Sequence, residues 1–191
     1  MKVGDMVLSG LILDQMEDDK RVNQHDINTS IFECNLNANE YLIDLVKNLP
    51  LEKKENFTSY LNLENEKQII EAITKYYHKN FEELIKVLYN KNNYEITNAW
   101  VQKYNESYHT LHTHGTDKSV KSFVWYIHAD EDSSPIKFYN PGYPYCYYYA
   151  KLIKPKANKF LLFDSYVPHE VLYNRKSQRV IISGNIKIWQ K

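Results

Sequence analysis

The chain has 191 residues, and its 24 Lys and Arg are balanced by 24 Asp and Glu, so the formal net charge is zero. This balance argues against binding of nucleic acid by bulk phosphate attraction and against a polybasic membrane-surface segment. A hydrophobic fraction of 43% is typical of a globular chain, and no apolar run approaches the ~20 residues of a membrane span. Two cysteines, Cys34 and Cys146, make no disulfide framework, so we expect a reduced, cytoplasmic protein.

The N-terminal part of the chain carries short strand and helix signals. Residues 6–13 and 31–36 are apolar enough for short strands, and the charged, Asn-rich residues 14–30 between them predict a surface loop. Asn39 stands where a helix N-cap belongs, because apolar residues follow it at helical spacing, and Pro50 ends that helix. These signals predict a strand, a loop, a second strand and then a helix.

A long amphipathic pattern over residues 65–89 predicts one helix, or two helices joined near residues 78–80. After Asn90 the helical periodicity stops, and short β-type runs follow with turn residues between them. We expect eight strands there, at residues 96–104, 108–114, 120–128, 136–139, 146–153, 159–163, 170–173 and 179–189. Such spacing is typical of a sandwich, jelly roll or barrel. We therefore expect a single α+β domain, with a strand and helices in residues 1–94 that support a jelly-roll core in residues 95–191.

Three of the seven histidines fall within six residues, in the segment YHTLHTHG. If this segment is a strand, His112 and His114 point to the same side, because side chains alternate along a strand. Two imidazoles on one face can bind one metal ion, since His is a common transition-metal ligand. Asp117 follows as a nearby carboxylate, whereas His109 is three residues from His112, out of register with its face, and is expected to be structural.

A second segment combines a histidine with an unusual arginine. A buried strand over residues 160–163 is followed by a turn, His169 opens the next strand, and Arg179 opens an apolar strand ten residues later. A buried charge is costly unless it is paired, so Arg179 needs an anion. Arginine can hold a carboxylate through two parallel hydrogen bonds, either of a ligand or, in a plain ion pair, of Asp164 or Glu170.

The histidines and the arginine follow one another in a fixed order: H-x-H, then about 55 residues, then His, then ten residues, then Arg. In this order the sequence resembles the iron(II)- and 2-oxoglutarate-dependent oxygenases. In particular, it resembles the small oxygenases of this type from marine phages and bacteria. The resemblance covers roughly residues 95 to 190. The matching pieces are Ala99-Trp100-Val101, His112-Thr113-His114, Trp125-Tyr126-Ile127, Phe138-Tyr139-Asn140-Pro141, Leu162-Phe163-Asp164-Ser165, Pro168-His169 and the strand from Arg179 to Asn185.

The resemblance implies a double-stranded β-helix, or jelly roll, with Fe(II) bound inside its open end. The usual ligands in this superfamily are two histidines and a carboxylate. Here the second position is His114, so the implied ligands are His112, His114 and His169. Asp117 is the alternative to His114, although reaching it from the strand requires a bulge or a turn.

The same resemblance implies that 2-oxoglutarate chelates the iron and that its distal carboxylate pairs with Arg179. Four further residues are implied co-substrate contacts: Tyr104, Tyr126, Ser183 and Asn185. The implied activity is that of a dioxygenase, in which O2-dependent decarboxylation of 2-oxoglutarate to succinate and CO2 is coupled to hydroxylation of a substrate C–H bond. The primary substrate is an unidentified peptide or small molecule, and peptidyl proline is one candidate by family analogy.

Two other classes of protein remain open on the sequence. A cupin-like metal enzyme without a co-substrate would also suit three histidine ligands, but it would not need Arg179 ten residues after the last of them. A non-enzymatic jelly-roll binding module would bind no metal, and its histidines would be dispersed. The Tyr-rich residues 143–149 predict either a substrate-binding lid, because tyrosine offers a flat surface with a polar tip, or an edge strand.

Overall fold

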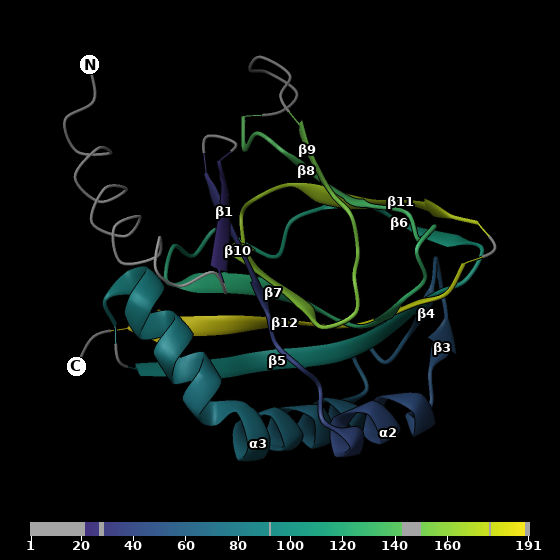
Figure 1. Cartoon of the computed structure of the whole chain (residues 1–191), viewed down its shortest axis with the longest axis horizontal. Helices are drawn as coiled ribbons and strands as arrows, with labels where there is room; N and C mark the ends of the chain where they lie inside the picture. The colour runs from purple at the N-terminus through teal and green to yellow at the C-terminus, as the bar shows by residue number, and fades with distance from the viewer. Residues whose placement is uncertain (1–21, 27–28, 92, 143–149, 176, 190–191) are drawn as a thin grey trace.

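Two antiparallel β-sheets face each other in the computed structural model, and two helices lie against the outer side of the larger sheet (Figure 1). The structure describes residues 22–26, 29–91, 93–142, 150–175 and 177–189. The larger sheet has the strand order β1 (Val22–Asp26), β2 (Ser30–Asn35), β10 (Lys159–Asp164), β7 (Val120–Ala129), β12 (Arg179–Trp189), β5 (Asn93–Tyr104), β4 (Phe57–Thr58) and β3 (Glu52–Lys53). The smaller sheet has the order β6 (Ser107–His112), β11 (His169–Asn174), β8 (Ile136–Tyr139) and β9 (Ala150–Ile153). The predicted α+β jelly roll is confirmed.

Both helices begin at an asparagine N-cap. In α2 (Glu40–Asn48) the side chain of Asn39 accepts a hydrogen bond from the Leu42 N–H, as the N-cap prediction requires. The long pattern forms one continuous helix, α3 (Leu63–Tyr89), so the single-helix alternative is the one observed. It ends at Asn90, which adopts a left-handed conformation with φ of 50°. No helix in the described part of the chain is long and apolar enough to cross a membrane.

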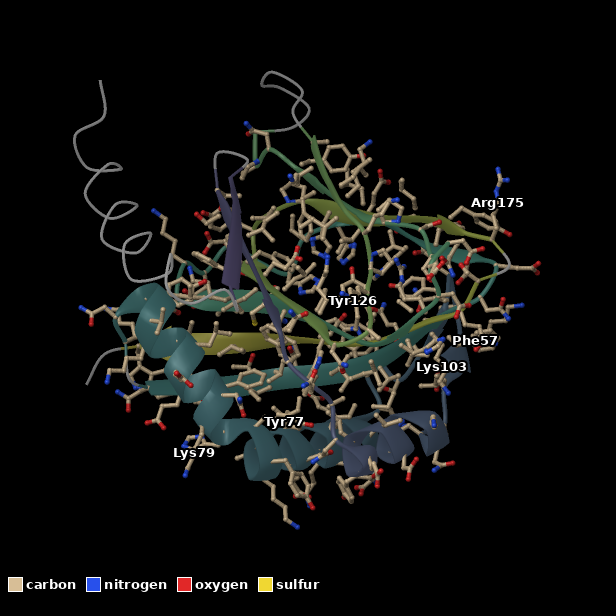
Figure 2. All side chains as sticks on the ribbon, in the orientation of Figure 1. Phe57, Tyr77, Lys79, Lys103, Tyr126 and Arg175 are labelled. Carbon is tan, nitrogen blue, oxygen red and sulfur yellow. The ribbon has the colours of Figure 1, made fainter. Side chains whose placement is uncertain are left out.

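The larger sheet is buried on both faces, which explains its nearly continuous apolar strands. On β7, Phe123 and Trp125 point toward the helices, and Phe81 of α3 packs edge-on against Phe123 at 5.9 Å between ring centroids. Val124 and Tyr126 point the other way, into the interior between the sheets. Figure 2 shows Tyr126 in this interior, while Tyr77 lies between α3 and the sheet. The interior face is therefore the one on which a site can be enclosed.

Some predicted elements differ from the observed ones. Residues 14–30 were expected to form a loop, but β1 lies within them and pairs antiparallel with β2. Its sequence, VNQHD, shows no alternation of apolar and polar residues and so gave no strand signal. This edge strand is held by its backbone pairing with β2. The two-residue strands β3 and β4 also gave no sequence signal. The expected strand at residues 6–13 and the Tyr-rich residues 143–149 lie outside the described residues.

Gly184 in the middle of β12 allows a close approach between strands. A Cβ atom there would lie 2.5 Å from the Asn98 carbonyl oxygen and 2.5 Å from the Phe123 ring. We expect Gly184→Ala to lower the free energy of unfolding by about 1–3 kcal/mol, since the ring and the backbone must both shift. Chemical denaturation of the metal-free protein measures this. Lys187→Ala, at an exposed position of the same strand, is the control, and an equal effect of both changes would contradict the prediction.

Candidate metal centre

Three histidines meet at one end of the interior. His112, the last residue of β6, is paired in register with His169, the first residue of β11. His114 lies two residues beyond the end of β6, where its backbone N–H donates to the Ser165 carbonyl at 2.8 Å. One ligand atom from each histidine lies within 4.8 Å of the others. The predicted strand over residues 108–114 is too long, so this backbone contact, rather than strand alternation, brings His114 beside His112.

Hydrogen bonds orient all three rings in the same way. In each ring, Nδ1 lies within hydrogen-bond distance of a carbonyl or amide oxygen: Thr110 O at 2.7 Å for His112, Asn185 Oδ1 at 2.9 Å for His114, and Val167 O at 2.9 Å for His169. Such oxygens only accept, so Nδ1 carries the proton and donates. Each Nε2 therefore keeps its lone pair, which is the form of imidazole that binds a metal ion.

Asn185 is held firmly beside His114. Its Nδ2 donates to Asn98 Oδ1 at 2.8 Å, and its Oδ1 accepts from the Ser122 hydroxyl at 2.6 Å. These partners fix the amide so that Oδ1 faces the His114 ring. Asn185 was expected to contact a co-substrate, and the structure places it as the hydrogen-bond acceptor that orients His114.

Burial keeps the three imidazoles neutral. Desolvation lowers the pKa of His114 from 6.5 to about 4, and the hydrogen bond to Asn185 opposes this only in part. Burial also lowers the pKa of His112, and it lowers that of His169, which is only 3% exposed, well below the ordinary range. Near pH 7 the three rings are therefore unprotonated at Nε2 without any bound ion.

The metal-free protein is expected to lose thermal stability in mild acid. The folded-state pKa of His114 is lowered to about 4 from 6.5, so the stabilisation is complete above pH 6.5 and is lost as the pH falls toward 4, where the unfolded chain binds more protons. With several such histidines, we expect a fall in Tm of at least roughly 5 °C between pH 7 and pH 5. Scanning calorimetry in the presence of a chelator measures it. His114→Asn should flatten the profile, and an unchanged slope would contradict this cause.

A fourth histidine joins the group through a bulge in β6. His169 pairs with His112 and Val171 pairs with His109, so two residues between the pairs on β6 lie opposite one on β11. This extra residue turns His109 to the same side as His112, with 4.1 Å between the ring centroids. The expectation that His109 faces the other side is therefore wrong, because the argument assumed an unbroken strand.

Arg179 lies in the interior with most of its guanidinium unpaired. The side chain is 1% exposed; Nη1 donates to the Ser134 carbonyl at 2.5 Å, and Cζ lies 4.1 Å from the centroid of the Tyr104 ring. In the described part of the chain, Nε and Nη2 have no hydrogen-bond partner. The carboxylates of two candidate partners are engaged elsewhere, Asp164 with Lys121 and Glu170 with Lys137.

Two other predicted residues lie on the same interior surface as Arg179. Tyr126 is fully buried, and burial raises its pKa to about 12, although the Arg179 charge opposes the rise. Ser183 follows on the interior face of β12 and donates to Gln102 Oε1 at 3.2 Å. Asp117, by contrast, is exposed and accepts hydrogen bonds from the Ser119 N–H and hydroxyl. The group that the structure brings together thus contains His114 and not Asp117.

A cavity of about 530 Å³ opens beside the histidines. Three of the histidines line it: His109, His112 and His114. The rest of the lining comes from the segment 54–60, from strands β5, β6 and β12, and from the turn after β6. These residues are Lys54, Glu55, Asn56, Thr58, Tyr60, Asn98, Trp100, Gln102, Thr110, Thr113 and Asn185. Trp100 stands between Tyr60, at 5.0 Å, and His114, at 5.5 Å between ring centroids. Sequence reasoning did not place Gln102 or Trp100 at the site. Trp100, Gln102 and Tyr104 follow one another at every second position of one strand, so they share a face with Tyr104, and this alternation is the signal that could have found them.

Comparison with known proteins identifies the fold. The sequence matches no family model and no curated protein sequence. Among solved structures, a 2OG-Fe(II) oxygenase family oxidoreductase from Burkholderia pseudomallei matches 94% of this chain and 77% of its own, with TM-score 0.52 and 12% identity. The α-ketoglutarate-dependent epimerase SnoN of nogalamycin biosynthesis matches 97% and 73%, with TM-score 0.52 and 7% identity.

A prolyl hydroxylase from Trichoplax adhaerens, in complex with a hypoxia inducible factor peptide fragment, is similar over 98% of this chain and 94% of its own, with TM-score 0.56 and 14% identity. These likenesses extend over nearly the whole chain. The class that fold and site define is that of a jelly-roll protein with the fold of the 2OG-Fe(II) oxygenases and a group of three histidines able to hold a metal ion.

Proposed function

We propose that this protein is a non-haem Fe(II), 2-oxoglutarate-dependent dioxygenase that hydroxylates a C–H bond of its substrate. The observation that carries the proposal is the unpartnered pair of donors, Nε and Nη2, on the buried Arg179. A cupin-like metal enzyme would share the histidine group, but it gives no reason for a buried cation that lacks an anion. A binding module would give no reason for three imidazoles with converging lone pairs.

The donor set fits the metal and the co-substrate. Three neutral imidazoles with Nε2 free are suitable ligands for Fe(II), and all come from His112, His114 and His169. The planar fork of Arg179 suits the distal carboxylate of 2-oxoglutarate, which would satisfy both orphaned N–H groups. When bound, the metal ion supplies the O2 chemistry, which no protein side chain can perform.

The residues of the chain hold the geometry around that chemistry. Asn185 and the carbonyls of Thr110 and Val167 keep the three rings in the metal-binding tautomer. Tyr104 and Tyr126, both neutral and fully buried, lie close to the Arg179 charge in the interior. Because strands from both halves of the chain form one sheet, we further propose that residues 1–191 act as one catalytic domain.

The primary substrate would enter through the cavity lined by Trp100 and Tyr60. The lining there is mostly neutral and hydrogen-bonding, which suits an uncharged peptide or small molecule. Hydroxylation of a peptidyl proline is one candidate by analogy with the structurally similar prolyl hydroxylase. The epimerase among the similar structures carries the same fold, so this choice rests on the fold analogy alone.

Anaerobic titration of Fe(II) and 2-oxoglutarate into the metal-free protein tests the proposal. Chelation of iron by the 2-oxo acid is expected to give a weak charge-transfer band in the visible spectrum. Binding of metal without the band, at saturating 2-oxoglutarate, would favour the cupin-like enzyme. Failure to bind any metal would mean that the histidines are structural and that the protein is a binding module.

A further inference from the structure

His109 makes hydrogen bonds of the opposite kind to those of its three neighbours. Its Nδ1 lies 3.3 Å from Gln102 Nε2 and 3.5 Å from the Tyr104 hydroxyl. The amide nitrogen can only donate, and the Tyr104 hydroxyl, which stays protonated in its buried site, is also able to donate. Nδ1 of His109 must therefore accept, which leaves its proton on Nε2.

The Gln102 amide also makes a hydrogen bond on its other side. Its Oε1 accepts a hydrogen bond from the Ser183 hydroxyl at 3.2 Å, so its Nε2 is turned toward His109. Gln102 is 5% exposed and Ser183 is 3% exposed, so little water competes with this chain of hydrogen bonds. This arrangement of Ser183 and Gln102 favours the tautomer of His109 that carries its proton on Nε2.

His109 lies between the metal ligands and the arginine. Its ring is 4.1 Å from that of His112, and its Nδ1 is 3.5 Å from the hydroxyl of Tyr104, whose ring in turn lies under the Arg179 guanidinium. It lines the cavity, and its Nε2 has no hydrogen-bond partner within the described ranges of the chain. A donor without a partner therefore stands on the path from the histidine group to Arg179.

We propose that His109 is a co-substrate-binding residue, whose Nε2–H donates to a carboxylate oxygen of the 2-oxo acid held between the metal ion and Arg179. Gln102 is the positioning residue that keeps the proton on Nε2. This inference rests on the proposed function, and it assigns His109 a role other than that of a fourth metal ligand. A protonated Nε2 has no lone pair to offer a metal ion, but it attracts the negative charge of a carboxylate.

Gln102→Glu is a nearly isosteric change that inverts this arrangement. The carboxylate can still accept from Ser183, but it can only accept from His109, so the His109 proton must move to Nδ1. Nε2 would then present a lone pair to the co-substrate carboxylate. Loss of a charge-assisted hydrogen bond predicts that the affinity for 2-oxoglutarate falls by about tenfold or more, while the affinity for Fe(II) is retained or raised.

Long-range ¹H–¹⁵N NMR spectra of the metal-free protein read the tautomers directly. We expect Nδ1–H for His112, His114 and His169, and Nε2–H for His109, with His109 alone changing in Gln102→Glu. His109→Phe, which removes the donor but keeps a ring of similar size, provides a second variant. His128→Gln is the matched control, because His128 lies at the surface with 52% of its side chain exposed.

The band of the Fe(II)–2-oxoglutarate complex measures the binding. The role of His109 is supported if both Gln102→Glu and His109→Phe weaken 2-oxoglutarate binding while Fe(II) still binds and His128→Gln has no effect. It is overturned if His109 carries Nδ1–H in the wild-type protein, or if both variants bind 2-oxoglutarate as tightly as the wild type. Absence of the band in the wild type would contradict the proposed function as well, so the two failures are distinguishable.

Discussion

His169→Ala is expected to abolish tight Fe(II) binding, and with it the charge-transfer band. His169 is the most deeply buried of the three converging histidines, and these three form the one group able to hold a metal ion among the described residues. Removal of an outer hydrogen-bond partner of a metal ligand typically costs 10–100-fold in affinity, so loss of the ligand itself should exceed about 100-fold. Competition against a chromophoric chelator under anaerobic conditions measures the affinity.

Two further variants separate ligation from folding. His169→Asn fills more of the space, and it should bind Fe(II) as poorly as His169→Ala while unfolding more like the wild type. His114→Asp restores a carboxylate at the second position and should retain Fe(II) binding, since carboxylates are good ligands for this ion. Retention of wild-type affinity in both His169 variants would show that the metal, if bound, is held elsewhere.

Replacement of Arg179 by methionine is expected to lower the affinity for 2-oxoglutarate by about 100-fold or more, because a buried, hydrogen-bonded charge pair loses one partner. The same change should leave the metal-free protein as stable as before, or more stable by about 1 kcal/mol. The reason is that Nε and Nη2 are buried without partners among the described residues, and a buried charge can often be replaced by an apolar side chain without loss of stability. Fe(II) affinity should be unaffected.

The sign of the stability change distinguishes two roles of Arg179. Removal of an arginine with a structural role would lower the free energy of unfolding. An arginine that binds an anionic ligand is unpaired in the ligand-free protein and destabilises it, so its removal should leave that form as stable or more stable. Arg179→Lys keeps the charge but loses the fork that can hold a carboxylate through two hydrogen bonds, so we expect intermediate 2-oxoglutarate affinity. Denaturant unfolding and anaerobic titration of the three proteins provide the measurements. Marked destabilisation of Arg179→Met with normal 2-oxoglutarate binding would contradict the assignment.

The central strands and helices could be predicted from the sequence because their signals are local. Asn39 caps α2 as the pattern indicates, and β8 and β12 have the predicted bounds. The misses are elements whose cause is not local. Strand β1 is polar and exists through pairing with β2, and the end of β6 depends on the contact of His114 with Ser165, 51 positions further along the chain.

The residues of the candidate site could be predicted from the sequence, but the hydrogen bonds that orient their side chains could not. The spacing of His112, His169 and Arg179 was enough to nominate the site, since each begins or ends a strand. The Nδ1 partners of His112 and His169 are carbonyls only two residues before them, but that of His114 is Asn185, 71 positions further along the chain, which sequence spacing could not show. The position of His109 depends on a bulge, which appears only when two strands are placed side by side.

The extra residue in β6 makes deletion and insertion, rather than substitution, the mutations that decide how many imidazoles face the cavity. Removal of one residue between His109 and His112 would remove the bulge and leave the two histidines two positions apart, so that plain alternation keeps both rings on the cavity side. Removal of two residues would make them neighbours and turn His109 to the other side of the sheet. The three converging histidines would stay in place. Related chains that are one residue shorter here would keep all four imidazoles on the cavity side, so a gap of one residue at this point of an alignment would not by itself signal the loss of His109 from the site.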